Sequence, residues 1–288
     1  MLAIIIAILI ALSFSLAMLI AQKGLVQQDT PWGVWVTLFT NCVFVLTAHM
    51  VLDPGARLLA LSNITFVVVG LFVPGVARLL IFRGIRNLGS STTTTILNSS
   101  PMFGATLAIL FLGERPGPSV LLGIGFVVGG LMVLSWMRGR LPSRYTEMLF
   151  PLTAALLFGS KDVLVRWGVV ASGSPTLGAA IAVTTATLEV WVILRCVQGN
   201  SFAIPHPRAL LWFVISGFFT GCAFLLTFIA LSIAEVTTVS PIFNCYSVFV
   251  LILAPLIARR VEPITRQKIL GALGVVAGVA LIAMGRGG

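Results

Sequence analysis

The chain has 288 residues, of which 58% are hydrophobic and only 9% are charged, and its mean hydropathy is +1.10. Because a soluble domain carries about 25% charged residues, this composition excludes a water-soluble globular protein and indicates a chain that lies in a lipid bilayer. The net charge of +10 would suit nucleic-acid binding. The positive residues instead fall in short gaps between apolar runs, so we expect them to set topology and expect no nucleic-acid partner.

Ten apolar stretches are each long enough to cross a bilayer, which takes about 20 apolar residues in a helix. In chain order the predicted spans are 2–22, 32–52, 62–82, 90–112, 118–136, 148–170, 175–197, 209–231, 234–258 and 267–285. The first stretch has no basic region before it and no clear cleavage site, so we predict a spanning helix and not a signal peptide. Since the connections are short, the activity is expected to lie within the membrane.

Lysine and arginine gather in the gaps that follow the odd-numbered spans, with twelve there against three in the opposite gaps and the tail. The twelve are Lys23, Arg83, Arg86, Arg138, Arg140, Arg144, Arg195, Arg208, Arg259, Arg260, Arg266 and Lys268. The other three are Arg57, Arg115 and Arg286. Because positive residues concentrate on the cytoplasmic side of a membrane protein, both termini are predicted to lie outside. The membrane expected is the cytoplasmic (inner) membrane of a bacterium.

The two halves of the sequence match each other at offsets that drift from 144 to 148 residues. The matched pairs include Pro31 with Pro175, Asn98 with Asn244, and Glu114 with Glu262. Such self-similarity indicates a duplication, with one repeat over 1–140 and the other over 145–288. Each repeat holds five predicted helices, and an odd number means that the second repeat enters the membrane from the opposite side. The expected fold is therefore an all-α membrane protein of two inverted five-helix repeats, with a site near the midplane.

Several short motifs support a family resemblance. They are Phe-Arg-Gly-Ile-Arg-Asn-Leu-Gly at 82–89, Ser-Ser-Pro-Met-Phe at 99–103, Leu-Gly-Glu-Arg at 112–115, Leu-Gly at 122–123, Phe-Gly-Ser at 158–160, Arg-Trp-Gly at 166–168 and Leu-Gly-Ala at 270–272. Together they resemble the EamA-type pattern of the drug/metabolite transporter superfamily over nearly the whole chain. The Gly113-Glu114 pair is the most specific piece, and the second half departs from it in having Arg260-Val261 before Glu262.

The resemblance implies ten helices around a central cavity, which helices one, three, four, six, eight and nine would line, while five and ten pack at the side. It also implies transport of amino acids, other metabolites, nucleotide sugars or drugs, so it does not fix the solute.

Ionisable residues inside a span cost roughly 2.5–3.5 kcal/mol each on insertion scales and are candidates for function. Lys161 and Asp162 lie near the middle of the sixth span, Glu189 lies in the seventh, and Arg78 lies in the last turn of the third. One interpretation is that Lys161 attracts an anionic group of the solute and Asp162 binds an amine or a coupling proton. In this interpretation Arg78 also binds the solute, and Glu189 is a second coupling residue. The other is that Asp162 pairs with Arg166 four residues on, that Lys161 pairs with Glu189, and that Arg78 reaches the headgroups.

Spans four and nine carry small polar residues next to a proline, which frees a backbone carbonyl inside the membrane. Asn98 and Asn244 occupy equivalent places in the repeat, beside Pro101 and Pro241, and Tyr246 follows Asn244 by two residues. If both asparagines point inward, they face each other across the pseudo-axis and bind the solute together with Tyr246. The alternative is that such residues join neighbouring helices.

Glycines spaced four apart permit close helix packing in spans five and ten. The pairs are Gly125 with Gly129 and Gly274 with Gly278. Either the two helices pack on each other, or the glycines form the face of a homodimer, and the sequence does not choose between these.

The function predicted from these observations is secondary active transport of a small organic solute across a lipid bilayer, by alternating access. No Walker A sequence is present, so energy would come from a proton or counter-substrate gradient. No intramembrane enzyme motif is found, and neither a catalytic residue, a metal nor a cofactor is expected. The charged residues suit an anionic or zwitterionic solute such as an amino acid; a hydrophobic cationic drug is the second candidate, and a channel the third.

Overall fold

The computed structural model describes residues 2–28, 30, 32–56, 63–88, 90–135, 145–198, 206–257 and 265–285, and within these all regular structure is helical. The first half contains α1 (Leu2–Gln27), α2 (Trp32–Leu52), α3 (Ile64–Leu71), the π-helix η2 (Phe72–Val76), α4 (Ala77–Leu88), α5 (Ser90–Leu97), α6 (Ser100–Leu112) and α7 (Pro118–Ser135). The second half contains the short 3₁₀ helix η3 (Tyr145–Met148), α8 (Leu149–Ser172), α9 (Pro175–Gln198), α10 (Pro207–Ile233), α11 (Val236–Asn244), α12 (Tyr246–Ile257) and α13 (Arg266–Met284).

Nine stretches within the described part of the chain are long and apolar enough to cross a membrane, and they coincide with nine of the predicted spans. The third predicted span corresponds to α3, η2 and α4, which follow one another from Ile64 to Leu88 without a gap. This segment is not one of the nine stretches, and its three helices have 8, 5 and 12 residues.

Two of the nine stretches are broken near their middle. α5 and α6 are separated at Asn98 and Ser99, with Pro101 in the first turn of α6. α11 and α12 are separated at Cys245, with Pro241 inside α11. Proline has no N–H and crowds the preceding turn, so both breaks fall where the sequence predicts freed carbonyls.

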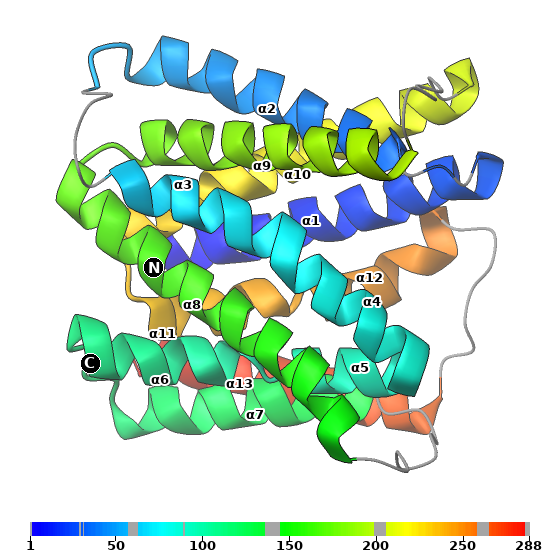
Figure 1. The fold of residues 1–288 in the computed structure, drawn as a ribbon. Helices are drawn as coiled ribbons and strands as arrows, with labels where there is room; N and C mark the ends of the chain where they lie inside the picture. Colours follow the sequence, from blue (N-terminus) through cyan, green and yellow to red (C-terminus); the bar gives the residue numbers. More distant parts are fainter. Residues whose placement is uncertain are drawn as a thin grey trace.

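The helices form a bundle with α8 running obliquely through it (Figure 1). α6, α7 and α13 lie at one side, and α2, α9 and α10 lie at the other. α1 packs along α10 and α12, while α8 packs against α3, α4 and α6. The start of α1 and the end of α13 lie toward the same end of the bundle (Figure 1).

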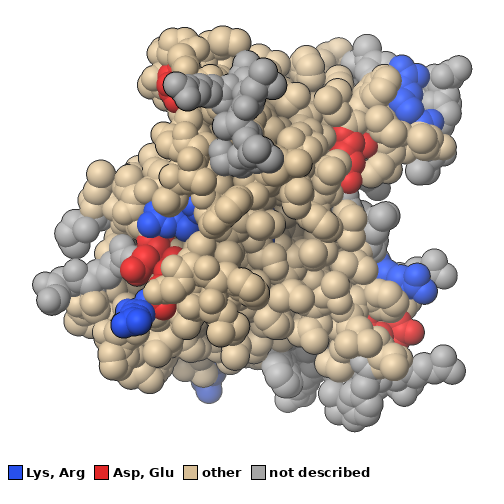
Figure 2. All heavy atoms as spheres, turned by 60° about the vertical axis from the view of Figure 1, so that its left-hand side comes forward, with Lys and Arg blue, Asp and Glu red and all other residues tan. Residues whose placement is uncertain are grey.

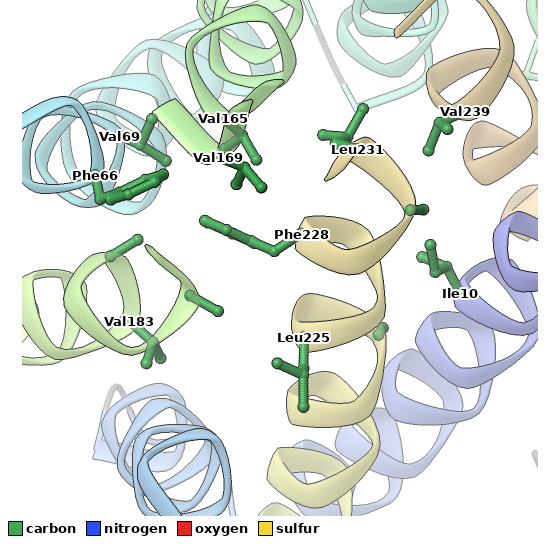
Figure 3. Packing of buried hydrophobic residues seen from close by; sticks show 14 of the residues in the cluster. Ile10, Phe66, Val69, Val165, Val169, Val183, Leu225, Phe228, Leu231 and Val239 are labelled. Atoms are coloured by element: carbon green, nitrogen blue, oxygen red, sulfur yellow. The ribbon is translucent and has the colours of Figure 1, made fainter. Parts of the chain in front are cut away.

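The larger apolar core joins α10 to α3, α8 and α9. Phe228 of α10 is 1% exposed and points between these helices (Figure 3). It meets Phe66 of α3 at a ring-centroid distance of 5.9 Å, and Val165 and Val183 lie close by. The outer surface is apolar as well. Many large apolar side chains are exposed, and charged groups are sparse on the face shown in Figure 2. A belt of this kind is expected to face lipid.

Glycines set how closely α7 and α13 pack. A Cβ atom built at Gly130 would lie 2.6 Å from the carbonyl oxygen of Gly271, and one built at Gly278 would lie 2.6 Å from that of Gly123. At Gly125 and Gly129, in contrast, no atom lies within 4 Å of the added Cβ. The Gly274–Gly278 motif therefore serves mutual packing of the two helices, while Gly125 and Gly129 face outward.

The neighbouring glycines of α7 allow a matched test of this contact. Gly130→Ala should lower stability by about 1–3 kcal/mol, because the added methyl forces two backbones apart. Gly129→Ala should leave stability unchanged or slightly higher, because its methyl enters open space and alanine favours the helix. Thermal unfolding midpoints of the two purified variants check this, and equal midpoints would contradict the packing described.

Candidate functional site

An ion pair between neighbouring residues lies in the middle of α8. The Lys161 Nζ atom is 2.9 Å from Oδ1 of Asp162, and the two side chains are only 15% and 8% exposed. A buried charge is strongly unfavourable without a partner. Neighbouring positions on a helix do not face each other, but the four-carbon lysine stem is long enough to bring the ammonium back to the carboxylate.

The second carboxylate oxygen of Asp162 binds the broken helix α11. The Ser240 hydroxyl donates a hydrogen bond of 2.6 Å to Oδ2 of Asp162. Ser240 is 3% exposed and directly precedes Pro241. One carboxylate thus joins α8 to α11 and also neutralises Lys161, so the position of α11 depends on this group.

One aromatic ring adjoins the ion pair, and two more pack against that ring. The Lys161 Nζ atom lies 5.9 Å from the ring centroid of Phe243, within reach of a cation–π interaction. Phe14 of α1 and Tyr246 of α12 complete the cluster, with centroid distances of 5.0 Å between these two and of 5.6 and 5.7 Å from each to Phe243. α1, α11 and α12 therefore each contribute one ring to this cluster, and Phe243 of α11 connects it to Lys161 of α8.

Two further predicted residues belong to the same region. Asn244 donates from Nδ2 to the Ser240 carbonyl oxygen at 2.8 Å, within α11. Tyr246 belongs to the aromatic cluster. The structure thus brings together four of the predicted site residues: Lys161, Asp162, Asn244 and Tyr246.

Asn98 has a different environment. Its Nδ2 donates to the Leu131 carbonyl oxygen at 3.0 Å and to the Ser135 hydroxyl at 2.6 Å, both on α7. The expected arrangement, in which Asn98 and Asn244 face each other, is not observed. The amide instead satisfies its donors at the break between α5 and α6 by bonding to the neighbouring helix, which is the alternative role foreseen for such residues.

The predicted pairs of Asp162 with Arg166 and of Lys161 with Glu189 are not formed. Arg166 donates from Nη1 to the Leu231 carbonyl oxygen of α10 at 2.6 Å, and Lys161 forms its ion pair with Asp162. Glu189 is half-buried on α9, where its Oε2 atom has no hydrogen-bond partner among the described residues. Arg78 lies in α4, but its side chain is outside the part of the chain that the structure describes.

Sequence reasoning did not single out Ser240, Phe14 or Phe243 as site residues. Ser240 is preceded by Thr237 and Thr238, and nothing in the pattern distinguishes the hydroxyl that meets Asp162 from the other two. The two phenylalanines stand among 19 in the chain. A signal exists in the spacing of Ser240, Phe243 and Asn244, which places the three on one face of a helix.

A cavity of about 330 Å³ lies beside this region, between α1, α11, α12 and α13. Its walls are apolar and include Ile8, Val248 and Val275, but neither Lys161 nor Asp162. This cavity therefore does not reach the ion pair, whose two side chains are largely buried.

The ion pair should show strong non-additivity on mutation. Asp162→Ala leaves the Lys161 ammonium buried without a partner and should destabilise the protein by about 3–5 kcal/mol. The double variant Lys161→Ala/Asp162→Ala should recover most of that loss, because no lone charge remains. Thermal unfolding of the wild type, both single variants and the double variant measures the coupling; additive effects would show that the two charges do not interact.

Both the sequence and the fold of the chain are similar to those of known proteins. A sequence model of the EamA-like transporter family matches residues 1–136 and again residues 146–284. A protein of known crystal structure has the same fold, with a TM-score of 0.81 at 16% sequence identity over 98% of this chain and 96% of that one. No curated protein matches the sequence. The family match confirms the resemblance drawn from the motifs.

Proposed function

Because the chain belongs to the EamA-like transporter family, it is a membrane transporter of the drug/metabolite transporter superfamily, and we propose that it is a secondary active carrier of a small zwitterionic or anionic metabolite. The observation that carries this proposal is the enclosed ion pair of Lys161 and Asp162. No enzymatic activity is proposed. The energy source is a proton or counter-substrate gradient.

The architecture proposed for this carrier is ten spanning helices in two inverted repeats. The family model matches twice, and α3, η2 and α4 supply the tenth span. Helix contacts repeat between the halves as well. α1 packs on α10 and on the broken segment α11–α12, while α8 packs on α3–α4 and on α6, which follows the break in the first half. Such a pseudo-symmetric frame allows two packings that open to opposite sides.

The orientation proposed rests on the charge bias of the sequence. Twelve lysines and arginines follow the odd-numbered spans against three in the opposite gaps and the tail, so both termini lie outside the cytoplasm. The membrane is the bacterial inner membrane.

A zwitterion suits the ion pair because it can replace both internal contacts at once. Its carboxylate would pair with the Lys161 ammonium, and its ammonium group would pair with Oδ1 of Asp162, so no buried charge is left unpaired. Asn244 and the hydroxyl of Ser240 lie beside the two charges and can accept or donate further hydrogen bonds. Tyr246, Phe14 and Phe243 would contact the apolar part of the solute.

Asp162 is the proposed coupling group, because a carboxyl shared between a solute and Ser240 can exchange its proton when the solute leaves. Asp162→Asn should abolish the pH dependence of uptake into proteoliposomes and leave solute exchange partly intact, because exchange needs no net proton movement. Glu189→Gln serves as the matched variant, since Glu189 is the other acidic candidate in the helices. If Asp162→Asn retains the full pH dependence and Glu189→Gln loses it, the coupling role belongs to Glu189.

A hydrophobic cation is the second candidate, and the aromatic cluster favours it. Three rings beside an acid can bind an organic cation through cation–π contacts, once Lys161 has moved away.

Lys161→Met separates the two candidates. For a zwitterionic solute the variant should bind at least about tenfold more weakly, because a charge-assisted hydrogen bond of about 1.5–3 kcal/mol is lost. For a cation the variant should bind as well as the wild type or better, because a competing ammonium is removed. Thermal-shift titration of the purified protein with amino acids, organic acids and cationic drugs gives the comparison, and tighter cation binding in the variant would reject the zwitterion.

A further inference from the structure

Glu114 is a buried carboxylate that the substrate site does not use. It follows Gly113, which ends α6 in the left-handed region at φ +68°, and this turn directs Glu114 back into the protein, where it is 8% exposed. Its Oε1 accepts a hydrogen bond of 2.8 Å from the Val236 N–H, and its Oε2 accepts one of 3.0 Å from the Thr237 N–H.

These two N–H groups are the first of α11. The first four N–H groups of any helix lack a partner inside the helix, and the residue that precedes α11, Glu235, makes no capping bond from its side chain. Glu114 therefore caps a helix that lies 122 residues away in the sequence. Both bonds are charge-assisted and run to the positive end of the helix dipole, so they are stronger than ordinary caps.

The capped helix is attached through a short link. α10 ends at Ile233, and Ala234 and Glu235 are extended, with φ, ψ of −143°, 159° and −68°, 149°, before α11 begins at Val236. Arg166 holds the carbonyl oxygen of Leu231 on the α10 side of this link. Glu114 holds the α11 side, so the link is fixed from both directions.

α11 also carries one wall of the proposed site. This nine-residue helix contributes Ser240 to Asp162 and places Phe243 beneath Lys161. Glu114 and Asp162 thus hold the same short helix, one at its N-terminus and the other near its middle. If the N-terminus of α11 were free, only the contacts of its side chains would keep it against α8.

We propose that Glu114 is a latch for α11. While its two bonds are intact, α11 stays against α8 and the ion pair remains enclosed. When they break, α11 moves on the link formed by Ala234 and Glu235 and exposes the pair toward the end of the bundle at which α6 and α7 connect. Glu114 is a positioning residue, and its part in turnover rests on the proposed transport function, whereas the latch itself does not.

The latch is tested without any solute by hydrogen–deuterium exchange of the purified protein in lipid nanodiscs. Glu114→Gln keeps the shape of the side chain but places an NH₂ donor against a backbone N–H. The amides of Val236 and Thr237 should then exchange at least about tenfold faster than in the wild type, whereas the amides of α7 and α13 should not change. Arg115→Gln is the matched control, because Arg115 is the next residue in the same loop and is exposed.

A second variant keeps Glu114 and removes one of its donors. Val236 is the first residue of α11, where proline fits, and Glu235 already has the extended conformation that a following proline requires. Val236→Pro should therefore fold and should speed the exchange of Thr237, by less than Glu114→Gln does. This variant also decides the question if Glu114→Gln does not fold.

Transport supplies the second readout. In proteoliposomes, Glu114→Gln should lower the maximal rate of exchange at least about threefold, because the population shifts toward the conformation open at one end, while solute binding is retained. Exchange at the wild-type rate, for the Val236 and Thr237 amides in Glu114→Gln and for the Thr237 amide in Val236→Pro, would overturn the latch. Equal acceleration in every helix would overturn it too. Local acceleration with an unchanged transport rate would overturn its part in turnover. If no solute is transported even by the wild type, the transport proposal fails, and the exchange data alone decide the latch.

Discussion

A single carboxylate in the middle of the bundle determines how α8 and α11 are held. One oxygen of Asp162 neutralises Lys161 and the other accepts from Ser240. In an apolar interior a lone charge is far more unfavourable than a paired one, so each group needs the others in place. The pair adds little to stability compared with an apolar core of the same volume. In the function proposed above, a solute with matching charges replaces these internal contacts without leaving a charge unpaired.

The mechanical arrangement follows from where the helices are broken. A continuous helix transmits a displacement along its whole length, but α11 is separated from α10 by two extended residues and from α12 by the break at Cys245. It can therefore move as a short unit while α10 keeps its apolar contacts with α3, α8 and α9 (Figure 3). The glycine-packed pair of α7 and α13 provides a rigid support at one side of the bundle. In the proposed latch, Glu114 at the N-terminus of α11 and Asp162 near its middle decide which packing is favoured.

The sequence predicts the membrane spans and the family well, because both rest on properties averaged over many residues. Nine predicted spans are matched, and both helix breaks occur beside the prolines that indicate them. Contacts of individual side chains are harder to predict. Helices that are apolar on all sides show no preferred face, so the rotation that turns Asn98 toward α7 cannot be read from its position in the repeat. Arg166 is spaced to reach Asp162 but binds a carbonyl oxygen on α10, because long side chains choose among partners that only the fold brings near. The motif Gly113-Glu114 identified the family, but its contact with α11 needed the structure.

We propose above that Lys161 and Asp162 form the solute site of a carrier. Counterflow in proteoliposomes tests it most directly, with vesicles loaded with an unlabelled amino acid and diluted into a trace of the labelled one. We expect a transient overshoot of label in the wild type and none for Lys161→Ala/Asp162→Ala, a variant that should stay folded because it leaves no lone charge. An overshoot that persists in the double variant would place the solute elsewhere, and label that enters without any overshoot would contradict a carrier altogether.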